Sequence, residues 1–169
     1  VFLTGELGAG KTYTLNQFIE QAQELGKRIA ITASTGIAAS HLGGTTIHSW
    51  SGLGIADSVR DDELDRMSWK PQIQERYNRC DILIIDEVSM LHGSRLDMVD
   101  RACRWIRHNE KPFGGLQVIL VGDMFQLPPV TRDSSETDYA HTSNAWRVAE
   151  LMPCYLTEQH RQGADDKLL

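Results

Sequence analysis

The stretch VFLTGELGAGKT, residues 1–12, decides which fold we expect for the chain. Its first three residues are apolar, which is typical of a buried strand. Gly5, Gly10, Lys11 and Thr12 then fit the phosphate-loop pattern G-x-x-x-x-G-K-[ST]. The glycines let backbone N–H groups turn toward a phosphate without a clash from Cβ. The helix that follows directs its positive N-terminal end at the same anion.

This loop predicts a site for ATP and Mg²⁺. Lys11 reaches the β- and γ-phosphates as a point charge, and the hydroxyl of Thr12 is a ligand for Mg²⁺. The alternative is a glycine-rich turn that fits the pattern by chance. The position between a strand and an amphipathic helix favours the nucleotide site. The residues expected to contact the nucleotide are Gly5, Gly8, Ala9, Gly10, Lys11, Thr12 and Tyr13.

Length and composition are those of an ordinary globular domain. The 169 residues suffice for one sizeable core, and 41% are hydrophobic and 24% charged. No apolar run is long enough to span a membrane, so we expect no membrane partner. The net charge of −6 argues against a broad basic surface for nucleic acid, but not against a narrow track that contacts a few phosphates.

The cysteines and the chain ends give two further expectations. Cys80, Cys103 and Cys154 are widely spaced and form no C-x-x-C pair, so we interpret them as small buried residues in a reducing compartment. The first strand starts at once, and residues 165–169 look truncated within an element. We therefore expect a piece of a longer chain.

Strand and helix patterns alternate along the chain, which predicts a parallel sheet with helices on both faces. A helix begins after Lys11 and ends at Gly26, with apolar residues on one face. Further strands are predicted at residues 28–32, 81–86, 116–121 and 154–157, and further helices at residues 71–79, 93–108 and 143–151. Residues 57–70 are charged and weakly patterned, so we expect a surface excursion there, and we expect a polar loop at residues 133–142.

Residues 32–54 are rich in Thr, Ser and Gly. Small hydroxyl residues at the end of a strand, followed by a short helix from Gly36, can hold a backbone phosphate. A polar loop with a capped helix accounts for the same residues equally well. If the segment does hold a phosphate backbone, we expect Thr35, Gly36, His48 and Ser49 to line the track, through neutral contacts that carry no base information.

Asp86 and Glu87 follow an apolar strand. One carboxylate of such a pair suits Mg²⁺ and the other suits polarisation of an attacking water, and we assign these roles to Asp86 and Glu87 in that order. Acids often end strands, so the pair gains its weight from the upstream phosphate loop. Gln126 is placed to sense a γ-phosphate, or else to make a hydrogen bond within its loop. We interpret Trp105 as a partly buried aromatic rather than a base-stacking residue.

Four blocks in this order resemble the Pif-one family of DNA helicases, five-prime to three-prime motors of superfamily one that are related to RecD. The resemblance implies an α/β, RecA-like P-loop NTPase domain, with a central, mostly parallel sheet and helices on both faces. It also implies that the first block faces DNA. The blocks are TASTGIAASHLGGTTIHSW, LIIDEVSM, PFGGLQVILVGDMFQLPPV and HRQ at residues 160–162.

The resemblance implies an ATP-dependent DNA helicase, of which this chain is the first motor domain. Catalysis would involve Lys11, Glu87, Gln126 and Arg161, and the last two would report on the γ-phosphate. The implied partners are ATP or ADP, single-stranded DNA and a second RecA-like domain. Implied roles are DNA repair, recombination and telomere maintenance. The implied location is intracellular: cytoplasmic in a bacterium or virus, and nuclear or mitochondrial in a eukaryote.

The chain also departs from the family pattern, which leaves alternatives open. The usual phosphate loop reads G-x-A-G-T-G-K-[ST], whereas GELGAGKT looks more like TsaE, a small ATPase of tRNA modification. That likeness leaves the other blocks unexplained. A kinase-type phosphotransferase should carry a lid with arginines, which we do not find. A non-catalytic nucleotide- or DNA-binding module should have lost Lys11 or Glu87, and both are present.

Overall fold

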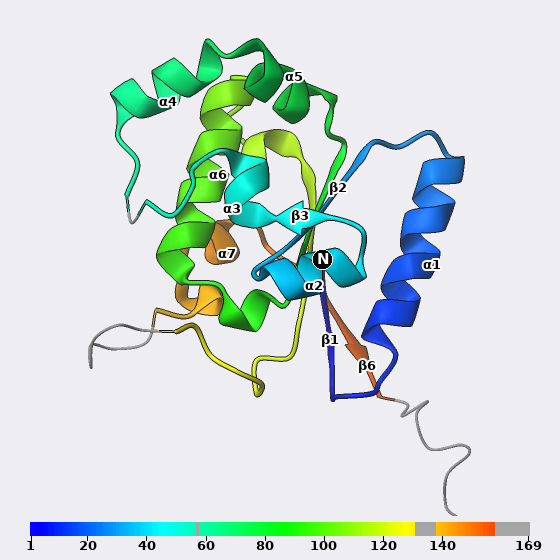
Figure 1. Cartoon of the computed structure of the whole chain (residues 1–169). Coiled ribbons are helices and arrows are strands. Elements are labelled where there is room, and N and C mark those ends of the chain that lie inside the picture. The colour runs from blue at the N-terminus through cyan, green and yellow to red at the C-terminus, as the bar shows by residue number, and fades with distance from the viewer. Residues whose placement is uncertain (57, 131–137, 158–169) are drawn as a thin grey trace, which may run out of the picture.

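The structure is a computed structural model that describes residues 1–56, 58–130 and 138–157. Its core is a six-stranded sheet in the order β3-β2-β4-β5-β1-β6. All pairings between these strands are parallel, which confirms the predicted sheet (Figure 1). The strands are β1 (Phe2–Gly5), β2 (Ile29–Ala33), β3 (Thr45–Thr46), β4 (Ile82–Asp86), β5 (Gln117–Val121) and β6 (Pro153–Leu156).

Helices cover both faces of the sheet, as predicted. Figure 1 shows α1 (Lys11–Glu24) on one side. Its buried residues Leu15 and Ile19 belong to a core cluster with sheet residues such as Leu3 and Ile84. The larger core lies on the other face. The helices that pack there are α3 (Ile47–Ser51), α4 (Asp61–Ser68), α5 (Pro71–Arg79), α6 (Gly93–Arg107) and α7 (Asn144–Val148). The shorter helices are α2 (Gly36–His41), η1 (Val88–Met90), η2 (Pro112–Gly115) and η3 (Ala140–Thr142).

Helix α4 contradicts the surface excursion expected at residues 57–70. Leu64 and Met67 are buried in the larger core. Three acidic residues in the first turn stabilise the helix, because their negative charges lie near its positive N-terminal end. The carboxylate of Glu63 also accepts a hydrogen bond from the N–H of Arg60 at 2.8 Å. Two apolar residues in eight were too few for a helical pattern to stand out from the charges.

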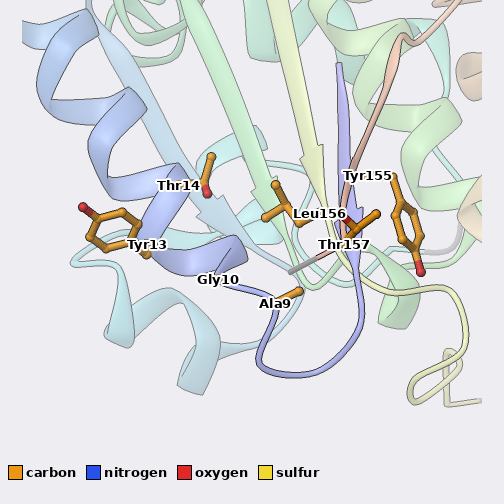
Figure 2. Close-up of a pocket in the computed structure, with 7 residues that line it drawn as sticks. All are labelled: Ala9, Gly10, Tyr13, Thr14, Tyr155, Leu156 and Thr157. Carbon is orange, nitrogen blue, oxygen red and sulfur yellow. The ribbon is translucent and has the colours of Figure 1, made fainter. Parts of the chain in front are cut away.

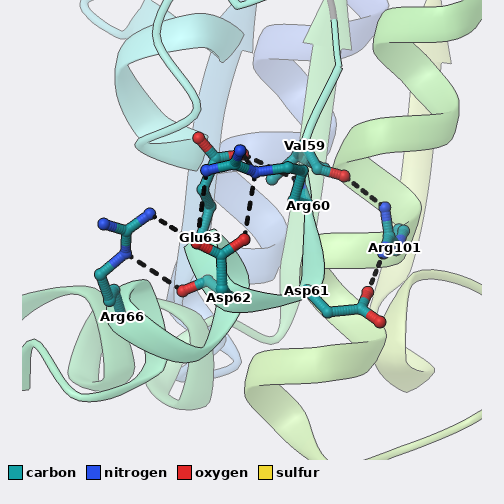
Figure 3. A network of polar contacts seen from close by, with 7 residues as sticks. All are labelled: Val59, Arg60, Asp61, Asp62, Glu63, Arg66 and Arg101. Carbon is teal, nitrogen blue, oxygen red and sulfur yellow. Dashed lines mark hydrogen bonds and ion pairs between the residues drawn. The ribbon is translucent and has the colours of Figure 1, made fainter.

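Arginine and tryptophan side chains of α6 hold α4 and the loop before it in place. Arg101 donates to the carbonyl of Val59 at 2.5 Å and forms an ion pair with Asp61 (Figure 3). The indole N–H of Trp105 donates to the Asp65 carboxylate at 3.0 Å. Trp105 is therefore a partly buried packing residue, which confirms its interpretation from the sequence.

Two smaller expectations, on the cysteines and on the polar loop, need adjustment. Cys80 and Cys103 are buried as expected, but Cys154 is exposed because it lies on β6, at the edge of the sheet. The last three residues of the expected polar loop form the short helix η3, and residues 133–137 lie outside the described part of the chain. Within the described residues, no helix combines the length and apolarity needed to cross a bilayer.

Candidate nucleotide and DNA site

The parallel sheet gathers the predicted site residues at one edge. The carboxyl ends of parallel strands meet at the same edge, and ligands of open α/β sheets bind there. The phosphate loop leaves β1 at this edge, Asp86 ends β4, and the segment with Gln126 leaves β5. Because β5 lies between β4 and β1, these three segments leave adjacent strands.

The loop between β1 and α1 has the backbone that the glycine pattern predicts. Gly10 caps α1 in the left-handed region with φ of 87°, which a residue with Cβ rarely adopts. Gly5 lies against the last strand, where an added Cβ would be 2.7 Å from the carbonyl oxygen of Leu156. Ala9 is buried, and its N–H donates to the carbonyl of Glu6 at 3.1 Å.

Lys11 follows this loop as the first residue of α1. Its ammonium group donates to the carbonyl oxygens of Gly5 at 2.8 Å and Glu6 at 3.1 Å. Thr12 and Tyr13 follow on the same turn, and both are exposed. A cation and a hydroxyl therefore flank the exposed start of a helix, where an anion is stabilised.

Asp86 and Glu87 form the acidic side of the site, and both side chains are half-buried. Burial raises the pKa of Asp86, while the N–H of Glu87 and the charge of Lys11 act in the opposite direction. Burial, and next the charge of Asp86, raise the pKa of Glu87. Because Lys11 influences both carboxyl groups, the structure places the phosphate loop and the acidic pair together. A carboxylate with a raised pKa suits the work of a general base.

Gln126 belongs to a loop that runs beside the acidic pair. Gly122 begins this loop, and an added Cβ there would be 3.2 Å from the backbone nitrogen of Val88, next to Glu87. The amide of Gln126 donates to the carboxylate of Asp123 at 3.2 Å, so the loop hydrogen bond considered as an alternative is present. The charge of Asp123 also contributes to the raised pKa of Glu87. Asp123 was missed, although its position two residues after the end of β5 could have indicated it.

The donor set fits Mg²⁺ as far as hydroxyl and carboxylate oxygens are concerned. Thr12 offers a hydroxyl and Asp86 a carboxylate at the same edge of the sheet, and Mg²⁺ prefers oxygen ligands. Mg²⁺ at nucleotide sites is held by one or two protein groups together with phosphate oxygens and waters. Among the described residues, no group of three or more His, Cys, Asp or Glu side chains could hold a metal ion alone.

A cavity of about 620 Å³ lies beside the phosphate loop. The sequence indicated part of this lining through Ala9, Gly10 and Tyr13. It missed the contribution of β6, because nothing in the residues says that the last strand pairs with β1. In the view of Figure 2, Thr14, Leu156 and Thr157 lie between Tyr13 on α1 and Tyr155 on β6. The lining residues are Ala9, Gly10, Tyr13, Thr14, Tyr155, Leu156 and Thr157.

The four residues expected on the DNA track lie on two neighbouring segments. Strand β3 pairs with β2 in parallel, with Ala33 opposite Thr46. Thus Thr35 and His48 each lie two residues beyond a paired position, at the same edge of the sheet. Gly36 and Ser49 are exposed next to them. This edge also carries the phosphate loop and the acidic pair.

The two short helices of this region begin at capped residues. The Thr35 hydroxyl caps α2 by accepting from the N–H of Ala38 at 3.3 Å, and Thr46 caps α3 through Ser49 at 3.2 Å. The predicted capped helix is therefore present, and it does not exclude a phosphate contact. Burial, and then the charges of Arg95 and His92, lower the pKa of His48. The neutral form of its imidazole is thereby favoured.

The sequence profile of the PIF1-like helicase family matches residues 1–168. The chain belongs to this family. A Pif1 helicase of Psychrobacter sp. is 51% identical over 164 residues, which are 96% of this chain and 25% of the relative. This confirms the resemblance carried by the four sequence blocks.

Solved structures of PIF1-like helicases share the fold. The Candida albicans Pif1 helicase matches with a TM-score of 0.88 and 35% identity, over 96% of this chain and 37% of the other. The Bacteroides Pif1 helicase in complex with ADP-AlF3 and single-stranded DNA matches with a TM-score of 0.84 and 36% identity, over 95% and 38%. This PIF1-like chain thus spans about a quarter of the length of its Psychrobacter relative. Arg161, in the fourth block, lies outside the described residues.

Proposed function

We propose that the chain is the first motor domain of an ATP-driven DNA helicase that translocates on single-stranded DNA and unwinds duplexes. The observation that carries the proposal is the meeting of Lys11, the Asp86–Glu87 pair and the Gln126 loop at the edge that also carries Thr35 and His48. Membership of the PIF1-like helicase family supports it. The five-prime to three-prime direction rests on the resemblance alone.

In this proposal, ATP lies with its phosphates on the loop of residues 5–12. Lys11 neutralises negative charge on the β- and γ-phosphate oxygens, and Glu87 accepts the proton of the attacking water. Gln126 and Arg161 sense the γ-phosphate. Thr12 and Asp86 hold Mg²⁺, which when bound supplies further neutralisation of phosphate charge. Positioning and charge stabilisation, rather than covalent chemistry, provide the catalysis.

The proposed partners are single-stranded DNA and a second RecA-like domain in the longer protein. The solved Bacteroides Pif1 helicase, which this chain resembles, is in complex with ADP-AlF3 and single-stranded DNA. This likeness supports a nucleotide and single-stranded DNA as ligands of this chain. An intracellular location follows from a DNA substrate. A nuclear, mitochondrial or cytoplasmic location depends on the organism.

One comparison of rates tests the function against its rivals. ATP hydrolysis is measured with and without oligo-dT, on a chain extended through the second motor domain. A helicase motor gives turnover that rises when DNA is added. Hydrolysis that ignores DNA points to a small P-loop ATPase, phosphate transfer to an acceptor points to a kinase, and lack of hydrolysis points to a binding module.

The DNA track is tested by Thr35→Ala and His48→Ala. We expect both to weaken binding of all single-stranded sequences alike, because hydroxyl and neutral imidazole contacts to phosphate carry no base information. Ser68→Ala serves as the control, since the Ser68 hydroxyl bonds the carbonyl of Asp65 within α4. Affinities are measured by fluorescence anisotropy with dT, dA and dC oligonucleotides. A loss confined to one base would argue for stacking readout instead.

A further inference from the structure

Glu87 has an unusual backbone conformation for its residue type. Its φ of 52° and ψ of 43° lie in the left-handed region, which L residues other than glycine rarely adopt. Such strained residues persist where their surroundings hold them, and they concentrate at functional sites. The direction of the Glu87 side chain therefore depends on whatever fixes this turn.

Ser34 on the neighbouring segment provides that support. Its N–H donates to the carbonyl of Asp86 at 3.0 Å, and its hydroxyl donates to the carbonyl of Glu87 at 2.8 Å. The two hydrogen bonds hold the peptide groups before and after Glu87, the residue with the strained backbone. The carboxylate of Asp86 adds a bond from the other direction, since it accepts from the N–H of Glu87 at 2.9 Å.

Ser34 is also the residue directly before the proposed DNA track. Thr35 follows it as the cap of α2, and Gly36 begins the helix and is exposed. A shift of the backbone at Thr35 reaches Ser34 across a single peptide bond. Among the described residues, no hydrogen bond joins residues 35–36 directly to residues 86–87. Ser34 therefore provides the shortest hydrogen-bonded link between the two segments.

We propose that Ser34 is a positioning residue that couples DNA contact at the start of α2 to the orientation of Glu87. The coupling rests on the proposed function, because it needs Glu87 as the base and Thr35 as part of the track. DNA that settles on Thr35 and Gly36 sets the position of Ser34, and the Ser34 hydroxyl then sets the turn at Glu87. This gives a direct route from DNA to ATP turnover.

Thr32 offers a matched control for a merely structural link. Its hydroxyl donates to the carbonyl of Ile84 at 2.6 Å, and it is fully buried. It therefore ties β2 to β4 with the same kind of bond two residues earlier, but this hydroxyl bonds to neither Thr35 nor Glu87. A general loss of contact between the strands would appear in both Thr32→Val and Ser34→Ala.

The experiment uses the helicase chain that includes the second motor domain. The variants are Ser34→Ala, Ser34→Thr, Thr32→Val and Glu87→Gln. For each, kcat and KM for ATP are measured with and without saturating oligo-dT, together with oligo-dT affinity in the absence of nucleotide and the thermal midpoint. We expect Ser34→Ala to lower the DNA-stimulated kcat about tenfold, the scale of one hydrogen bond, with a much smaller change in the DNA-free rate.

The other variants sharpen the interpretation. Ser34→Thr keeps a hydroxyl and should restore most of the stimulation, and Thr32→Val should keep the parental ratio of the two rates. Adding Ser34→Ala to Glu87→Gln should cost nothing further, since both act through one group. KM for ATP and oligo-dT affinity should stay close to parental in Ser34→Ala.

Two separate failures can be recognised. If Glu87→Gln hydrolyses ATP at the parental rate, the role of Glu87 in the proposed function is wrong. If Glu87→Gln is inactive but Ser34→Ala keeps the parental ratio of stimulated to DNA-free rates, the coupling alone is wrong. An equal fall of both rates in Ser34→Ala would also overturn it, because that pattern describes a structural link.

Discussion

At the scale of single residues, the ammonium group of Lys11 is the clearest sign of a phosphate site. It donates to two loop carbonyls, those of Gly5 and Glu6, at the exposed start of a helix. A charged phosphate oxygen is a stronger acceptor than a peptide carbonyl. Lys11 can therefore turn to an anion on the loop without leaving its helix.

We predict that Lys11→Ala weakens Mg·ATP binding and cuts turnover on the order of 100-fold or more, the scale for loss of one donor to the transition state. Lys27→Ala is the control, because Lys27 is exposed just beyond α1 and away from the loop. Steady-state ATPase and titration with a fluorescent nucleotide provide the readouts. Parental turnover in Lys11→Ala would mean that the phosphate-loop assignment is wrong.

A second residue-scale prediction concerns Asp81, directly before β4. The Arg28 guanidinium and the Arg28 N–H both bond its carboxylate, and they lower the pKa of Asp81 from 3.8 to about 2. A lowered folded-state pKa stabilises the protein above the unfolded pKa, and this stabilisation is lost as the pH falls through the folded pKa. The contribution of Asp81 should therefore be complete near pH 5 and should fade between about pH 4 and 2.

This behaviour can be measured directly by NMR titration of the Asp81 carboxyl carbon. In Arg28→Gln the pKa of Asp81 should return toward its ordinary value. The matched control is Arg79→Gln, because Arg79 pairs with Glu75 in a surface ion pair of similar length and does not bond Asp81. An unchanged Asp81 titration in Arg28→Gln would show that the pair does not hold the carboxylate ionised.

At the scale of elements, the sequence predicted most of the sheet but not every helix. Strands β2, β4 and β5 are apolar runs covered on both faces, and such runs stand out in the sequence. Helix α4 was missed because Leu64 and Met67 are its only buried residues, so packing rather than pattern defines it. The pairing of β6 with β1 was not predictable either, since strand order depends on long-range contacts. For that reason the cavity residues Tyr155 and Thr157 escaped notice.

Helix α4 should prove to be a genuine part of the core. We predict that Leu64→Ala destabilises the domain by about 2–5 kcal/mol, the usual range for a buried leucine that leaves a cavity. Leu25→Ala is a matched control, because Leu25 is 78% exposed while Leu64 is 0% exposed. Urea unfolding followed by circular dichroism gives the two free energies. An equal loss of unfolding free energy in both variants would mean that Leu64 is not a core residue and that a surface excursion at residues 57–70 is the better description.

At the scale of the whole molecule, parallel order explains why distant segments share one site. Four segments leave the sheet at the same edge: the phosphate loop after β1, the acidic pair at the end of β4, the Gln126 loop after β5 and the segment of the proposed DNA track after β2. Motif order along the chain could be recognised from sequence, but this meeting needed the sheet. In the proposed function, the same edge faces the second motor domain.

The last prediction concerns what these 169 residues do without that second domain. We expect them to bind Mg·ATP or Mg·ADP, to hydrolyse ATP very slowly and not to unwind DNA. Lys11, Thr12, Asp86, Glu87 and Gln126 lie at one edge of the sheet, so the phosphate and metal half of the site should form. The family resemblance implies another arginine in the second domain, and an arginine finger contributes ~10³–10⁵ in rate. Translocation also needs two domains that open and close across the nucleotide.

Steady-state ATPase of this chain with saturating oligo-dT, beside a longer chain with both domains, provides the measurement. Strong DNA-stimulated turnover at rates close to those of the longer chain would show a complete active site within residues 1–169 and would refute the two-domain argument.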